Sequence, residues 1–389
     1  MRNILVTLLL VFIVLTGCRV GEDNYALCSD EHRAATLPAV KSSAGRNVIL
    51  CIGDGMGAAQ VAAARITAGG LDGSLVMEKM PYAGLMRTHS GDSSVTDSAA
   101  AATALATGIK TNNGMVSVTP DGKKCVTILE AARDKGMATG LVCTCSVTHA
   151  TPAGFAAHVR HRKMEDEIAE QLLDSRVNVL LGGGRKFFLP ECDAASGRQD
   201  GRNLINAAIK DGYEYVENGG QLKRADGKYV LGLFACGPLT NEPAEPNLVE
   251  LTAKAIELLD RDSGGFFLMV EASQIDWDCH ANDIDGCIEK VLVFDKAVKK
   301  ALDFALSDRQ TVVIVTADHE TGGLTLHSAE DNKLRVAFKW STKGHSGAAV
   351  PVYAFGPGAQ VFSGVSDNTD IARKIAGLLG IKEFPKVLE

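Results

Sequence analysis

The chain has 389 residues, 46% of them hydrophobic and 22% charged, which is typical of a globular protein and excludes disordered and fibrous classes. Its 40 basic and 47 acidic residues give a net charge of −7 at pH 7. Because nucleic-acid binding depends on clustered basic residues, which this acidic chain lacks, we expect no nucleic-acid partner.

The N-terminal segment has the layout of an export signal. An apolar run from Ile4 to Leu15 follows Arg2, and its 12 residues are fewer than the roughly 20 that a membrane-spanning helix needs. Leu15-Thr16-Gly17-Cys18 resembles the lipobox of bacterial lipoproteins, whose cysteine is lipidated after cleavage. We expect residues 1–17 to be a lipoprotein-type signal peptide and 18–45 a tether. A plain signal peptide cut elsewhere is the alternative. Lipid on Cys18 would be the only membrane contact of a protein in the bacterial cell envelope, in the periplasm.

Short apolar runs then alternate with helical patterns. The sequence predicts strands over 47–53, 138–145, 177–182, 229–235, 265–271, 311–317 and 350–356, and helices over 58–68, 98–106, 288–305 and 369–379. Runs of Val, Ile and Leu without polar alternation are typical of strands buried on both faces. We therefore expect an α/β fold with a large, mostly parallel central sheet sandwiched by helices.

No linker divides the chain, so we expect residues 46–389 to form one domain. Its least regular part, about 190–246, is rich in Gly, Asp, Asn and Pro. This part is either a long surface excursion or a small inserted subdomain.

The ten cysteines give no structural zinc motif, because paired Cys-x-x-Cys sequences are absent. Export would permit disulfides. If Cys18 carries lipid, nine cysteines remain, so at least one thiol stays free. The sequence alone does not reveal their pairing.

Carboxylates and imidazoles gather where predicted strands end, which is where ligands bind in open α/β sheets. Six of them are Asp54, Asp276, His280, Asp318, His319 and His345, and Glu271 ends the strand before Asp276. Taken singly, each group also fits a turn, a surface pair or a helix cap. Oxygen and nitrogen ligands without cysteine are typical of catalytic zinc sites. Two such ions can stabilise the attacking and leaving oxygens of an in-line displacement.

Two further motifs bear on the chemistry. Gly53-Asp54-Gly55-Met56-Gly57 lacks the dinucleotide-binding spacing, and its carboxylate would repel a pyrophosphate. Ser98 begins an alanine-rich helix, where a serine is commonly a cap. A helix N-terminus also attracts anions, so a serine beside a metal there could attack phosphorus.

Together these motifs resemble the alkaline phosphatase family from about Asn47 to the C-terminus, through Ile52–Gly57, Asp97-Ser98-Ala99, Glu271 with Asp276 and His280, Thr316–Glu320 and Gly344-His345. The resemblance implies a metal-dependent hydrolase of phosphate monoesters. Ser98 would form a phosphoserine intermediate that water then hydrolyses, with net retention at phosphorus and inhibition by free phosphate. Arg162 would clamp two phosphate oxygens.

The resemblance also implies three metal sites. One zinc would be held by Asp276, His280 and His345, and a second by Asp54, Asp318 and His319. A third ion, usually magnesium, would use Asp54, Thr151 and Glu271.

The chain departs from the best-known bacterial form of the family at His149 and Trp277, which stand in place of Asp and Lys. His149 would shift the third site toward zinc or cobalt. Trp277 supplies no charge, so phosphate would bind less tightly and leave faster. The family is usually dimeric, and only 26 positions separate His319 from His345, too few for the extra interface domain of longer members. We therefore expect a homodimer with a smaller or different interface.

Three alternatives remain open. A phosphodiesterase of the same superfamily would usually carry threonine as nucleophile, and a sulfatase would need a C/S-x-P-x-R motif that the Ser98 segment lacks. The third is a non-catalytic envelope protein that binds phosphate or metal.

Overall fold

The computed structural model describes residues 37, 39, 45–191, 194–240, 242–329 and 336–388. The predicted signal peptide, Cys18 and nearly all of the predicted tether lie outside these residues. Among the helices of the described part, none is both long and apolar enough to cross a membrane.

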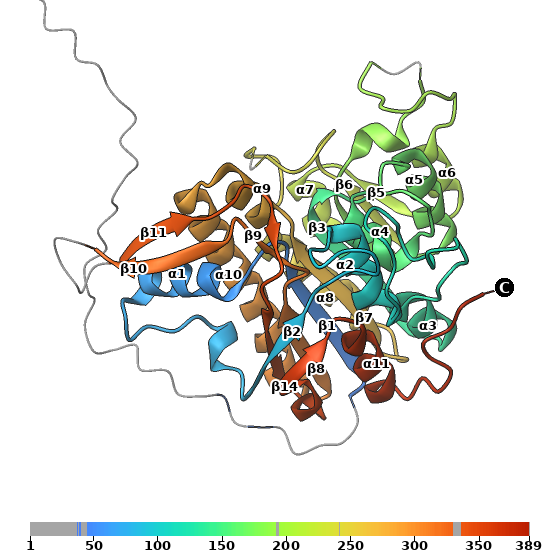
Figure 1. Ribbon diagram of the computed structural model, residues 1–389. Helices are drawn as coiled ribbons and strands as arrows, with labels where there is room; N and C mark the ends of the chain where they lie inside the picture. Colours follow the sequence, from blue (N-terminus) through green and yellow to red (C-terminus); the bar gives the residue numbers. More distant parts are fainter. Residues whose placement is uncertain are drawn as a thin grey trace, which may run out of the picture.

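A ten-stranded sheet forms the centre of the molecule (Figure 1). In spatial order its strands are β14 (Gly364–Asp367), β2 (Tyr82–Arg87), β13 (Val350–Phe355), β8 (Thr311–Thr316), β1 (Asn47–Gly53), β7 (Phe266–Ala272), β3 (Ala138–Ser146), β4 (Val179–Gly183), β6 (Val230–Leu233) and β5 (Glu214–Val216). All neighbours from β8 to β5 are parallel, whereas β13 is antiparallel to both β8 and β2. The expected α/β class with a mostly parallel sheet is confirmed.

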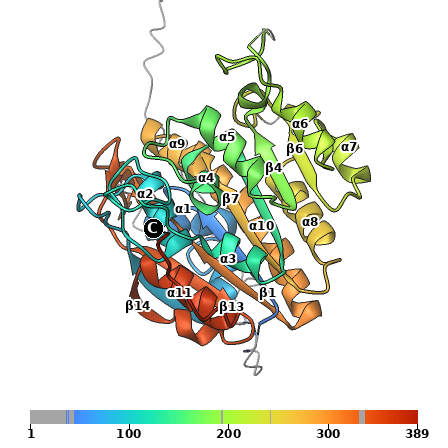
Figure 2. The same cartoon turned by 90° about the vertical axis from the view of Figure 1, so that its right-hand side faces the viewer.

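Helices cover both faces of this sheet (Figures 1 and 2). On one side α1 (Ala58–Gly69), α8 (Leu248–Leu259) and α10 (Ile284–Asp308) pack together, and on the other α2 (Ser98–Thr107), α3 (Ile128–Asp134), α4 (Ala150–Ala156) and α11 (Thr369–Leu378) do so. The remaining helices are α5 (Glu165–Asp174), α6 (Leu204–Lys210), α7 (Gly219–Arg224) and α9 (Gln274–Ala281), with short 3-10 turns at Met77–Lys79, Arg185–Phe188 and Ala359–Phe362.

The central strands are buried because helices cover both of their faces. Every residue of β1 and of β8 is buried. This explains why these strands read as unbroken apolar runs rather than as alternating patterns. Burying each Val, Leu or Ile side chain contributes about 1.5–3 kcal/mol, so the apolar residues of β1 and β8 stabilise the sheet.

The segment 190–246 is more regular than its composition indicates. It contains α6, β5, α7 and β6, and β5 and β6 are the outermost two strands at one edge of the main sheet. The short stretch between His319 and His345 also has structure of its own. There β10 (Leu324–Ser328) pairs antiparallel with β11 (Val336–Trp340), and β9 (Glu320–Thr321) pairs with β12 (His345–Ser346).

Candidate active site

The site lies where four neighbouring parallel strands end. β8, β1, β7 and β3 are adjacent in the sheet, so their carboxyl ends lie side by side. Asp54 directly follows β1, Asp318 follows β8 after Ala317, and Glu271 is the penultimate residue of β7. Figure 1 shows α9, β9 and α2 near this edge. The topology alone therefore gathers carboxylates that are far apart in the sequence.

Asp276, His280 and His345 converge in one group. His280 Nε2 lies 3.2 Å from His345 Nε2 and 3.3 Å from Asp276 Oδ2, and His345 Nε2 lies 3.5 Å from Asp276 Oδ1. Asp276 and His280 are one turn apart on α9 and so share a helix face. His345 Nδ1 contacts the Thr96 carbonyl at 2.8 Å, which turns Nε2 toward the group.

Asp54, Asp318 and His319 form a second group, and all three are fully buried. His319 Nε2 lies 3.5 Å from Asp54 Oδ1 and 3.2 Å from Asp318 Oδ2. Asp318 Oδ1 accepts hydrogen bonds from the backbone N–H groups of Gly55 and His319 at 3.1 and 2.9 Å. The His319 and His345 rings stack with centroids 3.6 Å apart, so the two groups touch.

A third group shares Asp54 with the second. Ligand atoms of Asp54, His149 and Glu271 lie within 4.8 Å of one another. Burial raises the pKa of Glu271 to about 7, and the Thr151 hydroxyl beside it opposes that rise. All three residues of the predicted third site, Asp54, Thr151 and Glu271, are thus brought together, with His149 beside them.

The buried carboxylates lack partners for several of their oxygens. Both Asp54 oxygens, Glu271 Oε1 and Asp318 Oδ2 are buried without a hydrogen bond. Burial, followed by the charges of Asp318, Asp276 and Glu271, raises the pKa of Asp54 well above its usual range. Burying unpaired carboxylates is costly unless a cation or a donor compensates them. The residues therefore fit divalent metal ions, which compensate several such oxygens at once.

Ser98 lies at the edge of these groups, at the N-terminus of α2. Ser98 is buried, and its Oγ lies 3.2 Å from His319 Nε2. Asp97, rather than Ser98, caps the helix, because Asp97 Oδ1 accepts the Ala100 N–H at 3.0 Å. The Ser98 hydroxyl is therefore free of the capping role that serines commonly have at this position.

Arg162 is held beside Ser98 by two partners. Its Nη1 donates to Asp97 Oδ2 at 3.3 Å, and its Nη2 donates to His149 Nε2 at 3.0 Å. The side chain remains about 23% exposed. Trp277 lies next to His149, with ring centroids 6.2 Å apart and an edge-to-face orientation. All the predicted site residues thus lie in one region.

Sequence reasoning missed Thr321, which links the first two groups. Its hydroxyl donates to Asp276 Oδ1 and lies 3.2 Å from His319 Nδ1. The Thr321 hydroxyl has one hydrogen, which it donates to Asp276. The hydroxyl oxygen therefore accepts the hydrogen bond from His319 Nδ1–H, and His319 Nε2 keeps its lone pair. The only signal in the sequence was position, since Thr321 follows His319 by two residues.

Gly55 belongs to the Gly-Asp-Gly motif at the end of β1, and the site depends on its lack of a side chain. Its φ is +75°, and a Cβ there would lie 2.8 Å from Asp276 Cα and 2.9 Å from Thr321 Oγ1. The backbone that follows β1 therefore passes directly against the residues of the first group.

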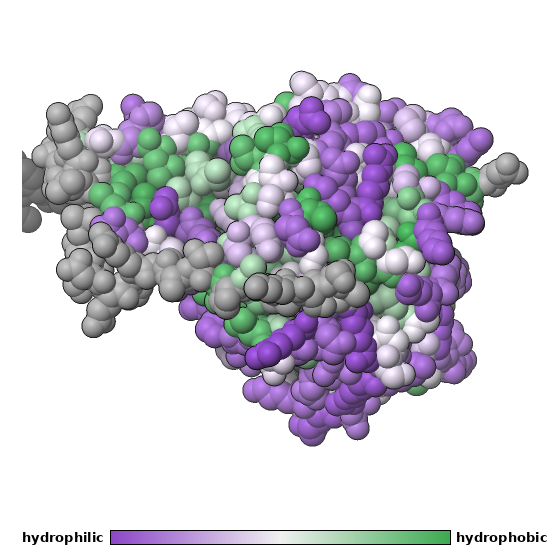
Figure 3. Space-filling view, turned by 90° about the horizontal axis from the view of Figure 1, so that it is seen from below, coloured by the Kyte–Doolittle hydropathy of each residue, from purple (hydrophilic) through white to green (hydrophobic). Residues whose placement is uncertain are grey.

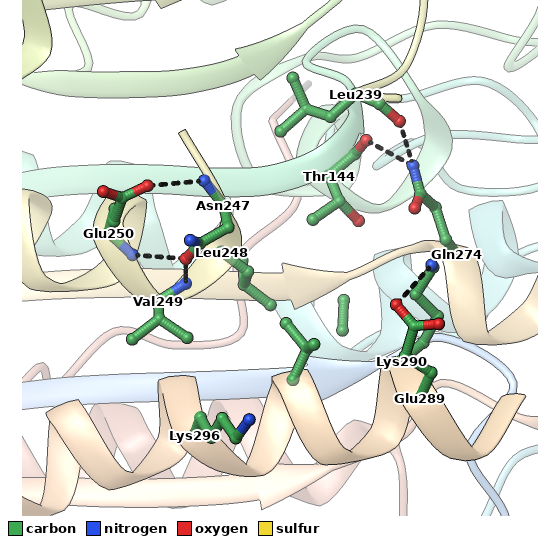
Figure 4. Close-up of a pocket in the computed structure, with 12 residues that line it drawn as sticks. Thr144, Leu239, Asn247, Leu248, Val249, Glu250, Gln274, Glu289, Lys290 and Lys296 are labelled. Carbon is green, nitrogen blue, oxygen red and sulfur yellow. Dashed lines mark hydrogen bonds and ion pairs between the residues drawn. The ribbon is translucent and has the colours of Figure 1, made fainter. Parts of the chain in front are cut away.

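A separate pocket of about 390 Å³ lies between α8 and α10 (Figure 4). Gln274 crosses its rim and donates to the carbonyls of Leu239 and Thr144 at 2.6 and 3.3 Å. None of the predicted site residues lines this pocket. The candidate site is thus a set of converging side chains rather than this cavity.

Comparison with known proteins assigns the chain to a family. The family model described as alkaline phosphatase matches residues 45–333 and 326–381. Alkaline phosphatase 3 of Bacillus subtilis strain 168 is 37% identical, over 85% of this chain and 88% of its own. The alkaline phosphatase structure from the Antarctic bacterium TAB5 is 34% identical, with a TM-score of 0.80, over 88% of this chain and 100% of its own.

A TAB5 variant with a histidine replaced by aspartate, solved with Mg bound in its M3 site, has a TM-score of 0.79 at 34% identity, with the same coverage of both chains. Similarity of this extent, in sequence and in fold, shows that the chain belongs to the alkaline phosphatase family of metal-dependent phosphatases.

Proposed function

We propose that the protein hydrolyses phosphate monoesters to an alcohol and inorganic phosphate through a phosphoserine intermediate on Ser98, with two zinc ions and a third ion bound. The observation that carries this proposal is the position of the Ser98 hydroxyl. It is not used as a helix cap, and it lies 3.2 Å from His319 Nε2 at the meeting point of the carboxylate and imidazole groups.

The chain itself supplies a phosphate cradle around Ser98. The free N–H groups at the start of α2 favour a phosphate oxygen, because the helix dipole is positive there. Arg162 presents a planar guanidinium that matches two phosphate oxygens. Asp97 holds this guanidinium in place from one side, so little side-chain freedom is lost when phosphate binds.

Two zinc ions, one held by Asp276, His280 and His345 and the other by Asp54, Asp318 and His319, would supply Lewis-acid stabilisation of the negative charge that develops on oxygen. In the first step Ser98 Oγ bonds to phosphorus and the bond to the alcohol oxygen breaks. In the second step water displaces Ser98 Oγ from phosphorus. The alcohol and the serine hydroxyl each regain a proton.

The test is hydrolysis of p-nitrophenyl phosphate at alkaline pH, before and after chelation, with bis-p-nitrophenyl phosphate as the diester control. We expect monoester turnover that chelation abolishes and zinc restores. Faster diester turnover would replace the proposal with a phosphodiesterase. Absence of turnover of both esters by the folded, metal-loaded protein would favour the non-catalytic binding protein.

We propose that the third ion, usually magnesium, is held by Asp54, Thr151 and Glu271. Arginine can only donate, so His149 Nε2 is the acceptor of the Arg162 hydrogen bond. In the neutral ring Nδ1 then carries the hydrogen and repels a cation. Burial lowers the pKa of His149 to about 4, which keeps the ring neutral. Should Arg162 turn to phosphate, the ring hydrogen could move to Nε2, and the lone pair then left on Nδ1 would suit zinc or cobalt better than magnesium.

Replacing His149 by aspartate should raise the affinity of the third site for magnesium about tenfold or more, because the change removes an N–H and adds a hard oxygen ligand. The TAB5 variant of the same substitution type, with Mg bound, supports this expectation. The measurement is magnesium titration of zinc-loaded protein by calorimetry. His327→Asp, on the exposed face of β10, adds the same charge away from the site. Equal gains in both variants would show a general charge effect instead.

We also propose that Trp277 allows faster phosphate release than a lysine would, because an indole supplies no positive charge beside the Arg162 and His149 pair. Product inhibition checks this directly. Trp277→Lys should lower the inhibition constant for inorganic phosphate, and an unchanged constant would contradict the proposed role.

The remaining expectations concern the assembled protein. We propose one domain over 46–389, a lipid on Cys18, a place in the bacterial cell envelope, and a homodimer.

Figure 3 shows hydrophobic residues in several patches of the surface seen from below. Leu85 and Val365 are paired across β2 and β14 and are 44% and 72% exposed, which supports an interface at that sheet edge. Sedimentation of the protein as a monomer would contradict the homodimer. A mass spectrum that shows Cys18 without a lipid would contradict the lipid anchor.

A further inference from the structure

Two cysteines close to the first ligand group have no role in the mechanism. Cys279 belongs to α9, between Asp276 and His280, and Cys287 belongs to the first turn of α10. Both are fully buried, and their sulfur atoms lie 3.4 Å apart. The described cysteines are all free thiols in the structure. The two sulfurs are nonetheless in direct contact, although they come from different helices.

The other close cysteine pair is engaged differently. Cys143 Sγ donates to the Cys145 carbonyl at 3.5 Å, and Cys145 Sγ donates to the Ser146 carbonyl at 3.2 Å. Cys287 Sγ, by contrast, has Cys279 Sγ as its hydrogen-bond contact among the described residues. Cys279 has one additional, long contact, from Gln60 Nε2 at 3.9 Å. These two sulfurs are therefore each other's nearest polar partner.

We propose that Cys279 and Cys287 are joined by a disulfide in the exported protein, and that this bond fastens α9, with Asp276 and His280, to α10. A disulfide needs a sulfur separation of about 2.05 Å. The sulfurs must approach by roughly 1.3 Å, which small rotations of both side chains supply. The bond itself is independent of the proposed function. Its consequence for the metal site rests on the proposed roles of Asp276 and His280.

The local backbone explains why a covalent link between α9 and α10 would stabilise the position of α9. α9 has only eight residues, and a helix this short is marginal without tertiary contacts. It ends at Asn282, whose φ is +60°, and the chain turns at once into α10. Residues of α9 and α10 pack against each other. A covalent link at Cys279, within the turn that separates the two ligands, fixes the orientation of both.

The redox chemistry needs an external oxidant. One thiolate attacks a disulfide of an envelope thiol oxidoreductase or of a small-molecule disulfide, and a mixed disulfide forms as one thiol of the oxidant leaves. The second cysteine then displaces the remaining thiol. The two cysteines lose two electrons and two protons, and the oxidant gains them. Because both sulfurs are buried in the folded protein, the exchange takes place before α9 packs against α10.

Peptide mapping tests the bond itself. Trypsin releases both cysteines in one peptide, 262–290, which follows Arg261 and ends at Lys290. Protein exported to an oxidising compartment is denatured with N-ethylmaleimide, without reductant, and then digested. We expect this peptide to be unlabelled and lighter by two hydrogens, and to take two labels only after reduction. Peptide 136–160, with Cys143 and Cys145, should take two labels without reduction and serves as the internal control. Two labels on unreduced 262–290 would overturn the proposal.

The rate of zinc release tests whether the disulfide holds Asp276 and His280 in place. Purified holoprotein is mixed with a chromogenic chelator, and the rate of zinc loss is followed by absorbance. We expect the double variant Cys279→Ala, Cys287→Ala to release zinc at least about fivefold faster than the parent. Cys125→Ala, which removes another buried free thiol, should release it at the parent rate. Equal rates of zinc release from all three proteins would overturn the proposal that the disulfide holds α9 and its two ligands in place. A parent protein that binds no zinc would instead contradict the proposed function, and the mapping result would still decide the bond.

Discussion

Replacing Ser98 by alanine should lower kcat for p-nitrophenyl phosphate by at least about 10³-fold, because alanine has no hydroxyl to receive the phosphoryl group at this position beside His319. Metal content and melting temperature should change little, since Asp97 rather than Ser98 caps α2. The measurement pairs steady-state rates with zinc analysis.

A second readout separates this role from a structural one. Acid-quenched parent protein should contain a phosphoryl group in tryptic peptide 88–110, localised to Ser98 by fragmentation, and the Ser98→Ala protein should not. Ser175→Ala, at the end of α5, serves as a control that removes another serine hydroxyl. Near-parental turnover by Ser98→Ala would exclude the covalent intermediate.

Replacing Gly55 by alanine should disrupt the metal site although no ligand changes. The new Cβ would lie 2.8 Å from backbone atom Cα of Asp276, and the φ of +75° is unfavourable for a residue with a side chain. α9 must therefore shift, and displacement of a positioning group by about 1 Å can cost about 10²-fold in rate. We expect that loss in kcat, together with reduced zinc content.

A matched control isolates the clash from the backbone strain. Gly136 has a φ of +86°, and nothing lies within 4 Å of a Cβ built there. Gly136→Ala should therefore lose only about 1–2 kcal/mol of unfolding free energy, for its left-handed φ, and keep full activity. Thermal unfolding and turnover of both variants separate the effect of the clash with Asp276 from the effect of backbone strain. Equal losses of activity would show that contact with Asp276 is unimportant.

The sequence predicted best the elements that are buried on all sides. β1 and β8 are continuous apolar runs in the sequence because helices cover both of their faces. β2 was missed because it lies near the sheet edge and alternates partly exposed with exposed residues along most of its length. β5 has only three residues, too few to produce a recognisable pattern.

Most of the candidate site follows from the position of residues at strand ends. Asp54 and Asp318 could be placed together because neighbouring parallel strands end at the same edge. Thr321, by contrast, reaches Asp276 through a two-stranded pairing of β9 with β12 that no pattern reveals. The contact of Cys279 with Cys287 depends on the angle at which α9 meets α10, which only packing decides.

The place of β1 in the sheet also bears on how the protein is made. β1 is the first of the described strands to be synthesised, yet its two partners are β7 and β8, which come far later in the chain. Contacts of such long sequence separation form late in folding. The ligands from Asp54 to His345 accordingly stay apart in a chain that is still on the ribosome. The candidate active site therefore cannot assemble until synthesis of the chain is nearly complete.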